Sequence, residues 1–317
     1  MIGTYEPEGR YFLAPMEGVT RTPFRILCRR RGAALVTTDM IDADTFCGIA
    51  DVRGTETAIT EQINPHEEDA PLVIQLGGSD PKTLARAARI LEPYAVIIDL
   101  NAGCPTGKTF RNGGGCTLMR DPERLYTIAQ TLRTTLTKPF TVKLRKGWDS
   151  PHAVEIAREL ERIGIDAITI HPRTREQRYS DRADWAYARE VKRAVTIPVT
   201  LSGDVTNATS AREAFAESEC DYLMIGRAAK QHPSVFSHLE NNTGIGRYGK
   251  SGNEPLADFL EWLELARTIE PPSLTDIREH ALWTVSEAEN AKELKRELAH
   301  ADDIIEIVKR ARFPEAS

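Results

Sequence analysis

Short apolar runs alternate with segments of helical periodicity along residues 1–240 of the chain. Each run has the length of a strand, and the stretches between the runs repeat apolar residues at helical spacing. The predicted strands are residues 11–14, 35–38, 72–76, 95–100, 140–144, 167–171, 198–201 and 222–225. Eight regular β-then-α units predict an α/β fold of the (β/α)8 barrel type rather than a doubly wound sheet.

The predicted helices include residues 81–91, 122–136, 151–163, 184–194 and 207–217. Three of them begin with a polar residue followed by proline, at Asp80-Pro81, Asp121-Pro122 and Ser150-Pro151. A polar cap with proline in the first turn is typical of a helix start. No glycine fingerprint follows the first strand, which argues further against a dinucleotide-binding doubly wound sheet.

The alternation stops after Pro233, and the composition changes. Residues 241–254 are rich in Gly, Asn and Ser and are interpreted as a linker. Residues 255–317 show helical patterns, and Pro271 and Pro272 separate two of the helices. We therefore expect a barrel over residues 1–240 and a bundle of three or four helices over residues 255–317.

Composition narrows the class of protein. The chain has 317 residues, of which 41% are hydrophobic and 28% charged, so it is globular and long enough for a barrel with a small appendage. It contains neither an apolar run of membrane-spanning length nor a basic-then-apolar signal at its start, so we expect a cytoplasmic protein without a membrane segment, and a monomer. Its five cysteines form no Cys-x-x-Cys pair, so we expect neither disulfides nor a metal site.

The charge is unevenly distributed. The formal net charge of -6 argues weakly against indiscriminate binding to a polyanion. From Ser251 onward the chain carries 8 basic and 15 acidic residues, whereas the remainder is nearly balanced. Any nucleic-acid surface should therefore lie mainly on the barrel.

The most informative segment runs from the fourth predicted strand through Asn101 and Cys104-Pro105 to a cluster of glycines that ends at Cys116. It places a thiol, an amide and a base, Lys108, near the carboxyl end of a strand, where parallel α/β folds keep their chemistry. A buried, inert cysteine in a loop is the ordinary alternative. The polar, glycine-rich surroundings make Cys104 our first candidate for a catalytic group.

Polar residues follow the other strands as well, and in a barrel these positions form one ring. Exposed backbone N–H groups at Gly203 and Gly226, beside Arg227, occupy the usual phosphate-binding position of such barrels. Taken alone, a lysine at a strand end is ordinarily solvated, and a His-Pro pair ordinarily forms a turn. Together they indicate a site for a phosphorylated ligand with a cationic wall of Lys143, Arg145, His171 and Arg173.

Over residues 11–235, the motifs resemble those of the tRNA-dihydrouridine synthases. The resemblance is carried by Leu13-Ala14-Pro15-Met16-Glu17-Gly18-Val19-Thr20, Asn101-Ala102-Gly103-Cys104-Pro105 with Lys108, Val142-Lys143-Leu144-Arg145 with Gly147-Trp148, His171-Pro172-Arg173-Thr174-Arg175-Glu176-Gln177, and Ile225-Gly226-Arg227. This order and spacing is specific, although each piece alone is weak. The family fold is an FMN-binding barrel followed by a small helical domain.

The resemblance implies a reaction in which NADPH, or NADH, reduces FMN, which then passes hydride to C6 of a uridine in tRNA while Cys104 protonates C5. It implies that FMN is held by Pro15, Met16, Gln75, Lys143, His171, Ser202, Gly203, Asp204, Gly226 and Arg227. Asn101 would orient the uracil. The residues expected near the substrate or its phosphates are Asn101, Lys108, Arg145, Arg173 and Thr174.

Three features depart from the family pattern. Ser202 stands where the family usually has Asn, which puts its side-chain contact with FMN in doubt. The flap at residues 113–119 contains Cys116, a potential second thiol near the site. The helical domain, which generally binds tRNA in this family, is acidic here. Either tRNA therefore binds mainly to the barrel, or the helices carry a local basic patch of Lys292, Lys295, Arg296, Lys309, Arg310 and Arg312.

Two other functions remain open from the sequence. One is an FMN barrel resembling dihydroorotate dehydrogenases that acts on a free pyrimidine or another small molecule. The helical C-terminal part and the His-x-Arg-Thr-Arg stretch disfavour it. The other is a non-catalytic RNA-binding module, against which the intact Cys104 and Lys143 argue.

Overall fold

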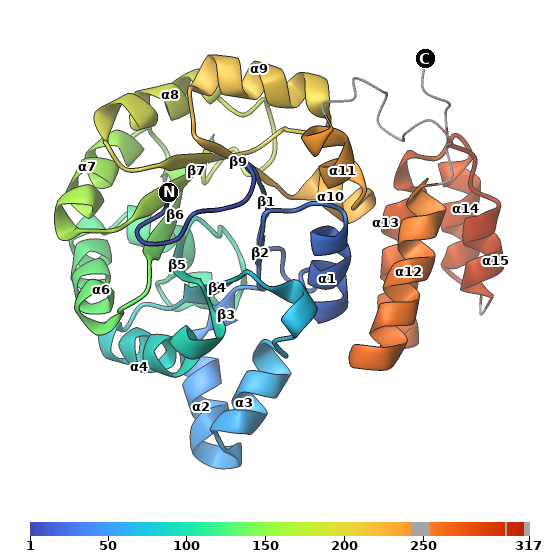
Figure 1. The fold of residues 1–317 in the computed structure, drawn as a ribbon, viewed down its shortest axis with the longest axis horizontal. Coiled ribbons are helices and arrows are strands. Elements are labelled where there is room, and N and C mark those ends of the chain that lie inside the picture. The colour runs from blue at the N-terminus through green and yellow to red at the C-terminus, as the bar shows by residue number, and fades with distance from the viewer. Residues whose placement is uncertain (242–253, 302, 314–317) are drawn as a thin grey trace.

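The computed structural model describes residues 1–241, 254–301 and 303–313, and its centre is a closed barrel of parallel strands (Figure 1). Eight strands form the ring, because β1 pairs with both β9 and β2, and β2 pairs with β4. The two-residue β3 adds a second contact along β4. The strands are β1 Tyr11–Leu13, β2 Leu35–Thr37, β3 Ile41–Asp42, β4 Leu72–Gly77, β5 Ile97–Ala102, β6 Phe140–Gly147, β7 Ala167–Thr174, β8 Val199–Ser202 and β9 Tyr222–Ile225. The prediction of a (β/α)8 barrel is confirmed.

Helices surround the barrel and are held at their first turns by the expected caps. The side chains of Asp80, Asp121, Asp184 and Asn207 each accept a hydrogen bond from a backbone N–H of the following helix. The helices of this layer are α1 Thr22–Arg30, α2 Ala43–Arg53, α3 Thr55–Gln62, α4 Pro81–Leu91, α5 Gly107–Arg111, α6 Pro122–Thr135, α7 Ala153–Ile163, α8 Trp185–Ala194, α9 Ala208–Ser218, α10 Arg227–Gln231 and α11 Val235–Glu240.

One predicted helix start is wrong. Helix α7 begins at Ala153, not at Pro151, and its N-cap residue is His152. The chain instead makes a tight turn after β6, in which a Cβ on Gly147 would lie 1.8 Å from the carbonyl oxygen of Ser150. The His152 ring secures this turn through contacts with the carbonyl oxygens of Ser150 and Met119, at 2.9 and 2.8 Å.

Strands β5, β6 and β7 extend two to three residues beyond the apolar runs that predicted them. Their ladders continue because the polar residues at these ends pair in register, Asn101 with Lys143 and Arg145 with His171. These side chains therefore project from paired backbone rather than from loops. A site built on strand ends is held more rigidly than one built on loops.

The core has two parts. The main cluster lies between the barrel wall and the helices, whereas a smaller cluster fills the amino-terminal end of the barrel. The smaller cluster contains Ile2, Phe12, Leu35, Val73 and Ile97. Figure 1 shows the N-terminal segment crossing this end of the barrel. The amino-terminal end is thus filled with apolar side chains, which leaves the carboxyl end for a site.

Four more helices lie beside α1, α10 and α11 (Figure 1): α12 Glu254–Ile269, α13 Leu274–Thr284, α14 Ala291–Leu298 and α15 Ile304–Lys309. They contact the barrel through aromatic and ionic groups. The ring of His280 in α13 lies 5.9 Å from the ring of Phe24 in α1, measured between centroids, and Arg31 bonds to Asp258 of α12 at 2.8 Å. Residues 242–253 of the predicted linker lie outside the described residues. None of the described helices combines the length and the apolar character needed to span a membrane.

A buried ion pair holds the loop that follows β1. Arg25 of α1 lies 2.7 Å from Asp69, and both side chains are almost completely buried. The same guanidinium donates to the carbonyl oxygens of Thr20 and Ile63 at 2.8 and 2.7 Å. Thr20 in turn donates to Asp39 at 2.5 Å. The Arg25–Asp69 pair therefore fixes the segment that carries Pro15 and Met16.

We expect Asp69→Ala to lower the free energy of unfolding by about 3 to 5 kcal/mol, because it leaves the buried guanidinium of Arg25 uncompensated. Urea denaturation would measure this loss. Glu61→Ala, which breaks the exposed pair with Arg53, serves as the control and should cost less than about 1 kcal/mol. Equal effects of the two variants would contradict the structural role of Asp69.

Candidate active site

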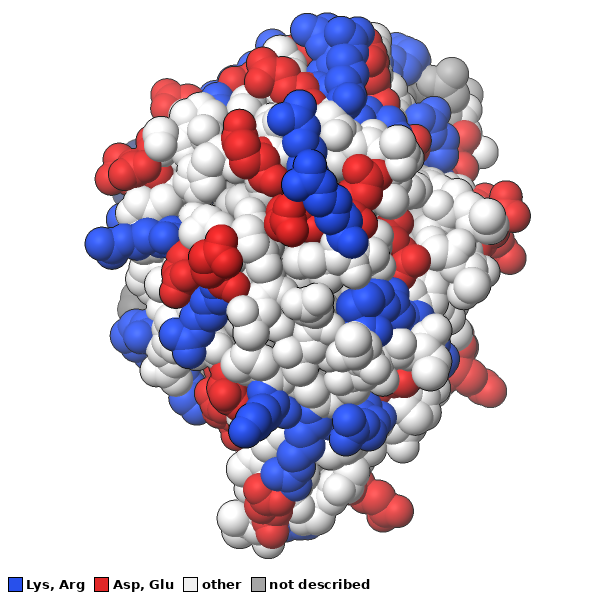
Figure 2. All heavy atoms as spheres, turned by 90° about the vertical axis from the view of Figure 1, so that its left-hand side faces the viewer, with Lys and Arg blue, Asp and Glu red and all other residues white. Residues whose placement is uncertain are grey.

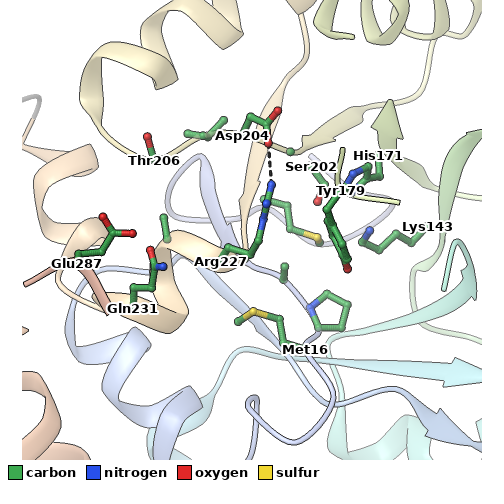
Figure 3. Close-up of a pocket in the computed structure, with 17 residues that line it drawn as sticks. Met16, Lys143, His171, Tyr179, Ser202, Asp204, Thr206, Arg227, Gln231 and Glu287 are labelled. Atoms are coloured by element: carbon green, nitrogen blue, oxygen red, sulfur yellow. Dashed lines mark hydrogen bonds and ion pairs between the residues drawn. The ribbon is translucent and has the colours of Figure 1, made fainter. Parts of the chain in front are cut away.

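Two adjoining cavities open at the carboxyl end of the barrel, with volumes of about 480 and 510 Å³. Each has the size of a small-molecule or cofactor site. Figure 3 shows the first, which we call the β8–β9 cavity; the second, the Cys104 cavity, lies toward β5. The walls that the two share are Pro15, Met16, Lys143, His171, Tyr179 and Arg227.

The β8–β9 cavity is lined by the glycines predicted to bind phosphate, together with Ser202 and Asp204. Gly203 has a φ of +141°, which few other residues adopt, and a Cβ there would lie only 3.0 Å from the Cβ of Ala183. A Cβ on Gly226 would lie 3.5 Å from the Cβ of Ala14 and 3.7 Å from the Sδ of Met16. A side chain at Gly203 would therefore be strained, and one at Gly226 would contact two residues that line the cavity.

Asp204 organises the cationic edge of this cavity. It accepts hydrogen bonds from Arg173 at 2.5 Å and from the amide of Ala183 at 2.7 Å. It also accepts one from Arg227 at 2.8 Å (Figure 3). Burial alone would raise the pKa of Asp204, but these hydrogen bonds and the two guanidinium charges outweigh burial and hold that pKa below its usual value. The carboxylate thus stays ionised and fixes Arg227 beside the cavity.

Cys104 lines the second cavity with its side chain partly exposed, and its Sγ lies 3.4 Å from the carbonyl oxygen of Thr106. Its backbone is fixed on both sides. Asn101 Oδ1 accepts from the amides of Gly103 and Cys104 at 3.0 and 2.8 Å, and the Cys104 carbonyl accepts from Cys116 at 2.9 Å. Gly115 packs so closely that a Cβ there would lie 2.6 Å from that carbonyl oxygen.

Beneath Cys104, a buried chain of hydrogen bonds orients Asn101. Asn101 donates to Gln75 at 2.7 Å, Gln75 donates to Asp99 at 2.8 Å, and Thr141 donates to the other Asp99 oxygen at 2.6 Å. Burial raises the pKa of Asp99, although these hydrogen bonds and the charge of Lys143 oppose the shift. Sequence reasoning missed Asp99, because it lies within a strand rather than after it.

Lys143 stands between the two cavities, on the strand position paired with Asn101. Burial and, next, the positive charge of Arg145 lower its pKa to about 8, while Asp99 and Cys104 partly offset this shift. At pH 7 the ammonium still carries its charge. The site therefore holds a cation whose charged form is destabilised in the absence of an anionic partner.

His171 is neutral in this environment. Burial lowers its pKa well below the usual value, and the neighbouring cations Lys143, Arg145, Arg173 and Arg227 add to the shift. Arg173 Nη1 lies 3.3 Å from His171 Nε2. Because a guanidinium only donates, Nε2 is the acceptor, and Nδ1 carries the ring proton.

The predicted substrate residues are not all brought together. Asn101 and Arg145 line the Cys104 cavity. Gln75, which the resemblance assigned to FMN, also lines this cavity and not the β8–β9 cavity. Arg145 is buried and donates to the carbonyl oxygens of Gly103, Thr174 and Arg178 at 2.8, 3.0 and 3.1 Å. Arg173 and Thr174 are buried behind the cavities and line neither. Lys108 points toward α2, where it donates to Thr45 at 2.7 Å.

Tyr179 belongs to the site but was not predicted. Its side chain, 57% exposed, lines both cavities from the loop between β7 and α8. The guanidinium groups of Arg227 and Arg145 lie 5.1 and 5.8 Å from its ring centroid, so the ring interacts with both cations. No periodicity marks this loop; its place after a barrel strand was the only available signal.

The other predicted features lie farther from the cavities. Cys116 is buried, and burial raises its pKa to about 11, so its thiol stays protonated. In the suggested basic patch of the C-terminal helices, Lys309 pairs with Glu306 and Arg310 pairs with Glu297. Acidic neighbours thus neutralise part of that patch.

These observations define a (β/α)8-barrel enzyme whose thiol faces one of two connected cavities. Its sequence matches the family described as Dihydrouridine synthase (Dus) over residues 12–315. It is 33% identical over 311 residues to tRNA-dihydrouridine synthase B of Pseudomonas aeruginosa, covering 95% of this chain and 91% of that protein. It is 38% identical over 264 residues to a probable tRNA-dihydrouridine synthase of Rickettsia bellii, covering 82% of this chain and 77% of that protein. The chain belongs to the dihydrouridine synthase family, a family of oxidoreductases.

Solved structures share the barrel at low sequence identity. The old yellow enzyme homologue from Zymomonas mobilis superposes with a TM-score of 0.54 at 11% identity, covering 78% of this chain and 92% of that one. A morphinone reductase variant gives a TM-score of 0.55 at 13% identity, covering 79% of this chain and 91% of that one. At these identities the likeness concerns the fold.

We expect Lys143→Met to stabilise the ligand-free protein at pH 7 by about 1 to 3 kcal/mol, because it removes a desolvated charge whose pKa is lowered to about 8. Since the unfolded chain keeps the proton up to about pH 10.5, the gain should shrink as the pH rises from 8 to 10.5. Urea denaturation at several pH values measures it. Lys82→Met on the exposed face of α4 is the control, and an unchanged or lower stability of Lys143→Met at pH 7 would contradict the assignment.

Proposed function

We propose that this protein reduces a uridine of tRNA to 5,6-dihydrouridine, with FMN as cofactor and NADPH or NADH as reductant. The observation that carries the proposal is the thiol of Cys104 in a cavity that adjoins, through Lys143 and His171, a second cavity of cofactor size. Curated relatives at 33–38% identity are named tRNA-dihydrouridine synthases, which supports the substrate class.

The residues of the β8–β9 cavity fit FMN. The N–H groups at Gly203 and Gly226 and the guanidinium of Arg227 would hold the phosphate, and the side chains of Pro15 and Met16 would support the ring system. When bound, FMN supplies the hydride that the nicotinamide reductant has delivered to it. Ser202 lines this cavity too, so a hydroxyl is available where the family usually has an amide.

Lys143 and His171 supply the electrostatics of the reduction. A fixed ammonium at Lys143 stabilises negative charge that develops on a ligand between the two cavities. An anionic partner also restores the pKa of Lys143 toward its ordinary value. The neutral His171 can donate only through Nδ1, because Nε2 faces the guanidinium of Arg173.

Cys104 acts as the general acid that delivers a proton to C5 of the uracil. Asn101 positions it, because Asn101 Oδ1 accepts from the Cys104 amide, and Gln75 fixes the Asn101 amide. One Nδ2 hydrogen of Asn101 points to an acceptor in the protein, and the other can serve a uracil carbonyl. Since a stacked base is out of reach of a cavity, the target uridine must be flipped out of the RNA.

Incubation of unmodified tRNA with the purified protein, FMN and NADPH should yield dihydrouridine at a defined position, detected by nucleoside mass spectrometry. Free uridine and dihydroorotate serve as comparison substrates, and NADH replaces NADPH in a parallel series. If the bound flavin is reduced but no dihydrouridine forms, the tRNA activity is refuted. Turnover of dihydroorotate instead would identify a small-molecule pyrimidine oxidoreductase.

Cys104→Ala should retain FMN but reduce uridine about 10² to 10⁴ times more slowly, the usual contribution of a general acid. Gly115→Ala should also slow the reaction, because its Cβ would displace the Cys104 carbonyl. Gly113→Ala is the matched control: it also has a positive φ, but its Cβ would meet only Ser79 at 3.6 Å. Unchanged single-turnover rates in Cys104→Ala would remove Cys104 as the acid.

A further inference from the structure

Two aromatic rings and two arginines form a cluster that the proposed chemistry does not use. Phe110 of α5 and Trp148, which follows β6, stack with centroids 6.0 Å apart and an interplanar angle of 12°. The guanidinium of Arg175 lies 5.6 Å from the Phe110 centroid and 5.1 Å from the Trp148 centroid, and that of Arg120 lies 5.5 Å from Trp148. We call these four side chains the aromatic–arginine platform.

The platform lies on the rim beside Cys104. Helix α5 begins at Gly107, three residues after Cys104, and the carbonyl of Phe110 accepts from Thr117 of the segment that packs on Cys104. The amide of Arg175 bonds to the carbonyl oxygens of Gly147 and Trp148, both at 3.0 Å. The rings and Arg175 thus sit where β5, β6 and β7 end, the same strands that carry Asn101, Lys143 and His171 into the cavities.

Both rings of the platform are partly exposed, and its cations are not neutralised. Among the described residues, neither Arg120 nor Arg175 forms an ion pair, and Arg175 Nε is buried without a hydrogen-bond partner. Some arginines on the outer helices are paired instead, as Arg86 is with Asp51 and Arg193 with Glu219. On the face shown in Figure 2, basic and acidic side chains are interspersed. The uncompensated arginines of the platform are therefore free to engage an external anion.

We propose that the platform stacks one unpaired nucleotide of the RNA substrate next to the flipped uridine, while Arg175 and Arg120 hold its phosphate or base edge. The inference rests on the proposed function and specifies how the RNA is held. Exposed aromatic rings combined with arginine are the chemistry that recognises unstacked bases. Flipping the target uridine exposes the faces of its neighbours, which supplies such a base. An acidic peptide would satisfy the arginines but would leave the ring faces without a planar partner.

Equilibrium binding of unmodified tRNA to the oxidised, FMN-loaded enzyme tests the platform without turnover. Trp148→Ala should weaken binding about tenfold, the scale of one base–aromatic stack, and Trp148→Phe should restore most of it. Arg175→Gln should reduce the slope of the logarithm of the binding constant against the logarithm of the salt concentration by about the share of one phosphate contact. Tyr94→Ala is the matched control, since this 43% exposed aromatic precedes β5 at the opposite end of the barrel.

The same variants separate this proposal from the proposed function. In steady state, Trp148→Ala should raise KM for tRNA and leave the rate of flavin reduction by NADPH unchanged. Wild-type binding by both Trp148→Ala and Arg175→Gln would overturn the platform even if dihydrouridine forms. If the wild-type enzyme makes no dihydrouridine, the proposed function fails, and tRNA binding that depends on Trp148 still supports the platform. Binding of a polyacidic peptide with the same dependence on Arg175, but none on Trp148, would overturn base stacking.

Discussion

The site depends on the side chain of Asn101, which is anchored below and caps the turn above. Below it, Gln75 links it to the buried Asp99. Above it, its Oδ1 accepts the amides of Gly103 and Cys104, so the chain leaves β5 with the thiol directed into the cavity. Because these hydrogen bonds link Asn101 both to Gln75 and to the amides of Gly103 and Cys104, the backbone that carries Cys104 has little freedom to rearrange. The position of the thiol is thus a consequence of barrel packing.

The pairing register of strands β5, β6 and β7 also brings positive charges together where they are unfavourable in the protein without a ligand. Lys143 pairs in the ladder with Asn101, and Arg145 pairs with His171, so one end of the barrel gathers several cations in a partly desolvated space. Burial and, next, the neighbouring cations lower the pKa values of Lys143 and His171. A packed barrel tolerates these cations because Asp204 neutralises two of the guanidinium groups. The remaining positive potential suits an anionic cofactor and substrate.

The sequence predicts the barrel well because each strand is an apolar run bounded by polar residues, and the parallel topology then places all strand ends on one rim. The ring of polar residues at that rim follows from the topology, as Lys143, His171 and Arg227 illustrate. Contacts set by side-chain direction do not follow from it. Arg173 lies behind the cavities, where it donates to Asp204, and Tyr179 lines both cavities from a loop without periodicity. Asp99 could not be predicted, because it lies inside the apolar run that predicted the strand, and nothing in the pattern distinguishes it as a functional residue.

The distribution of uncompensated charge separates the roles of the two parts of the chain. The helices after residue 254 are acidic, and at Lys309 and Arg310 they neutralise their own cations, so they offer little general attraction for a polyanion. On the barrel rim, by contrast, Arg120 and Arg175 lie against aromatic faces rather than carboxylates. Attraction that is local to the rim favours RNA only where a base can also stack. Binding of the RNA and reduction of the uridine would then be coupled, because both depend on the ends of the same three strands, β5, β6 and β7.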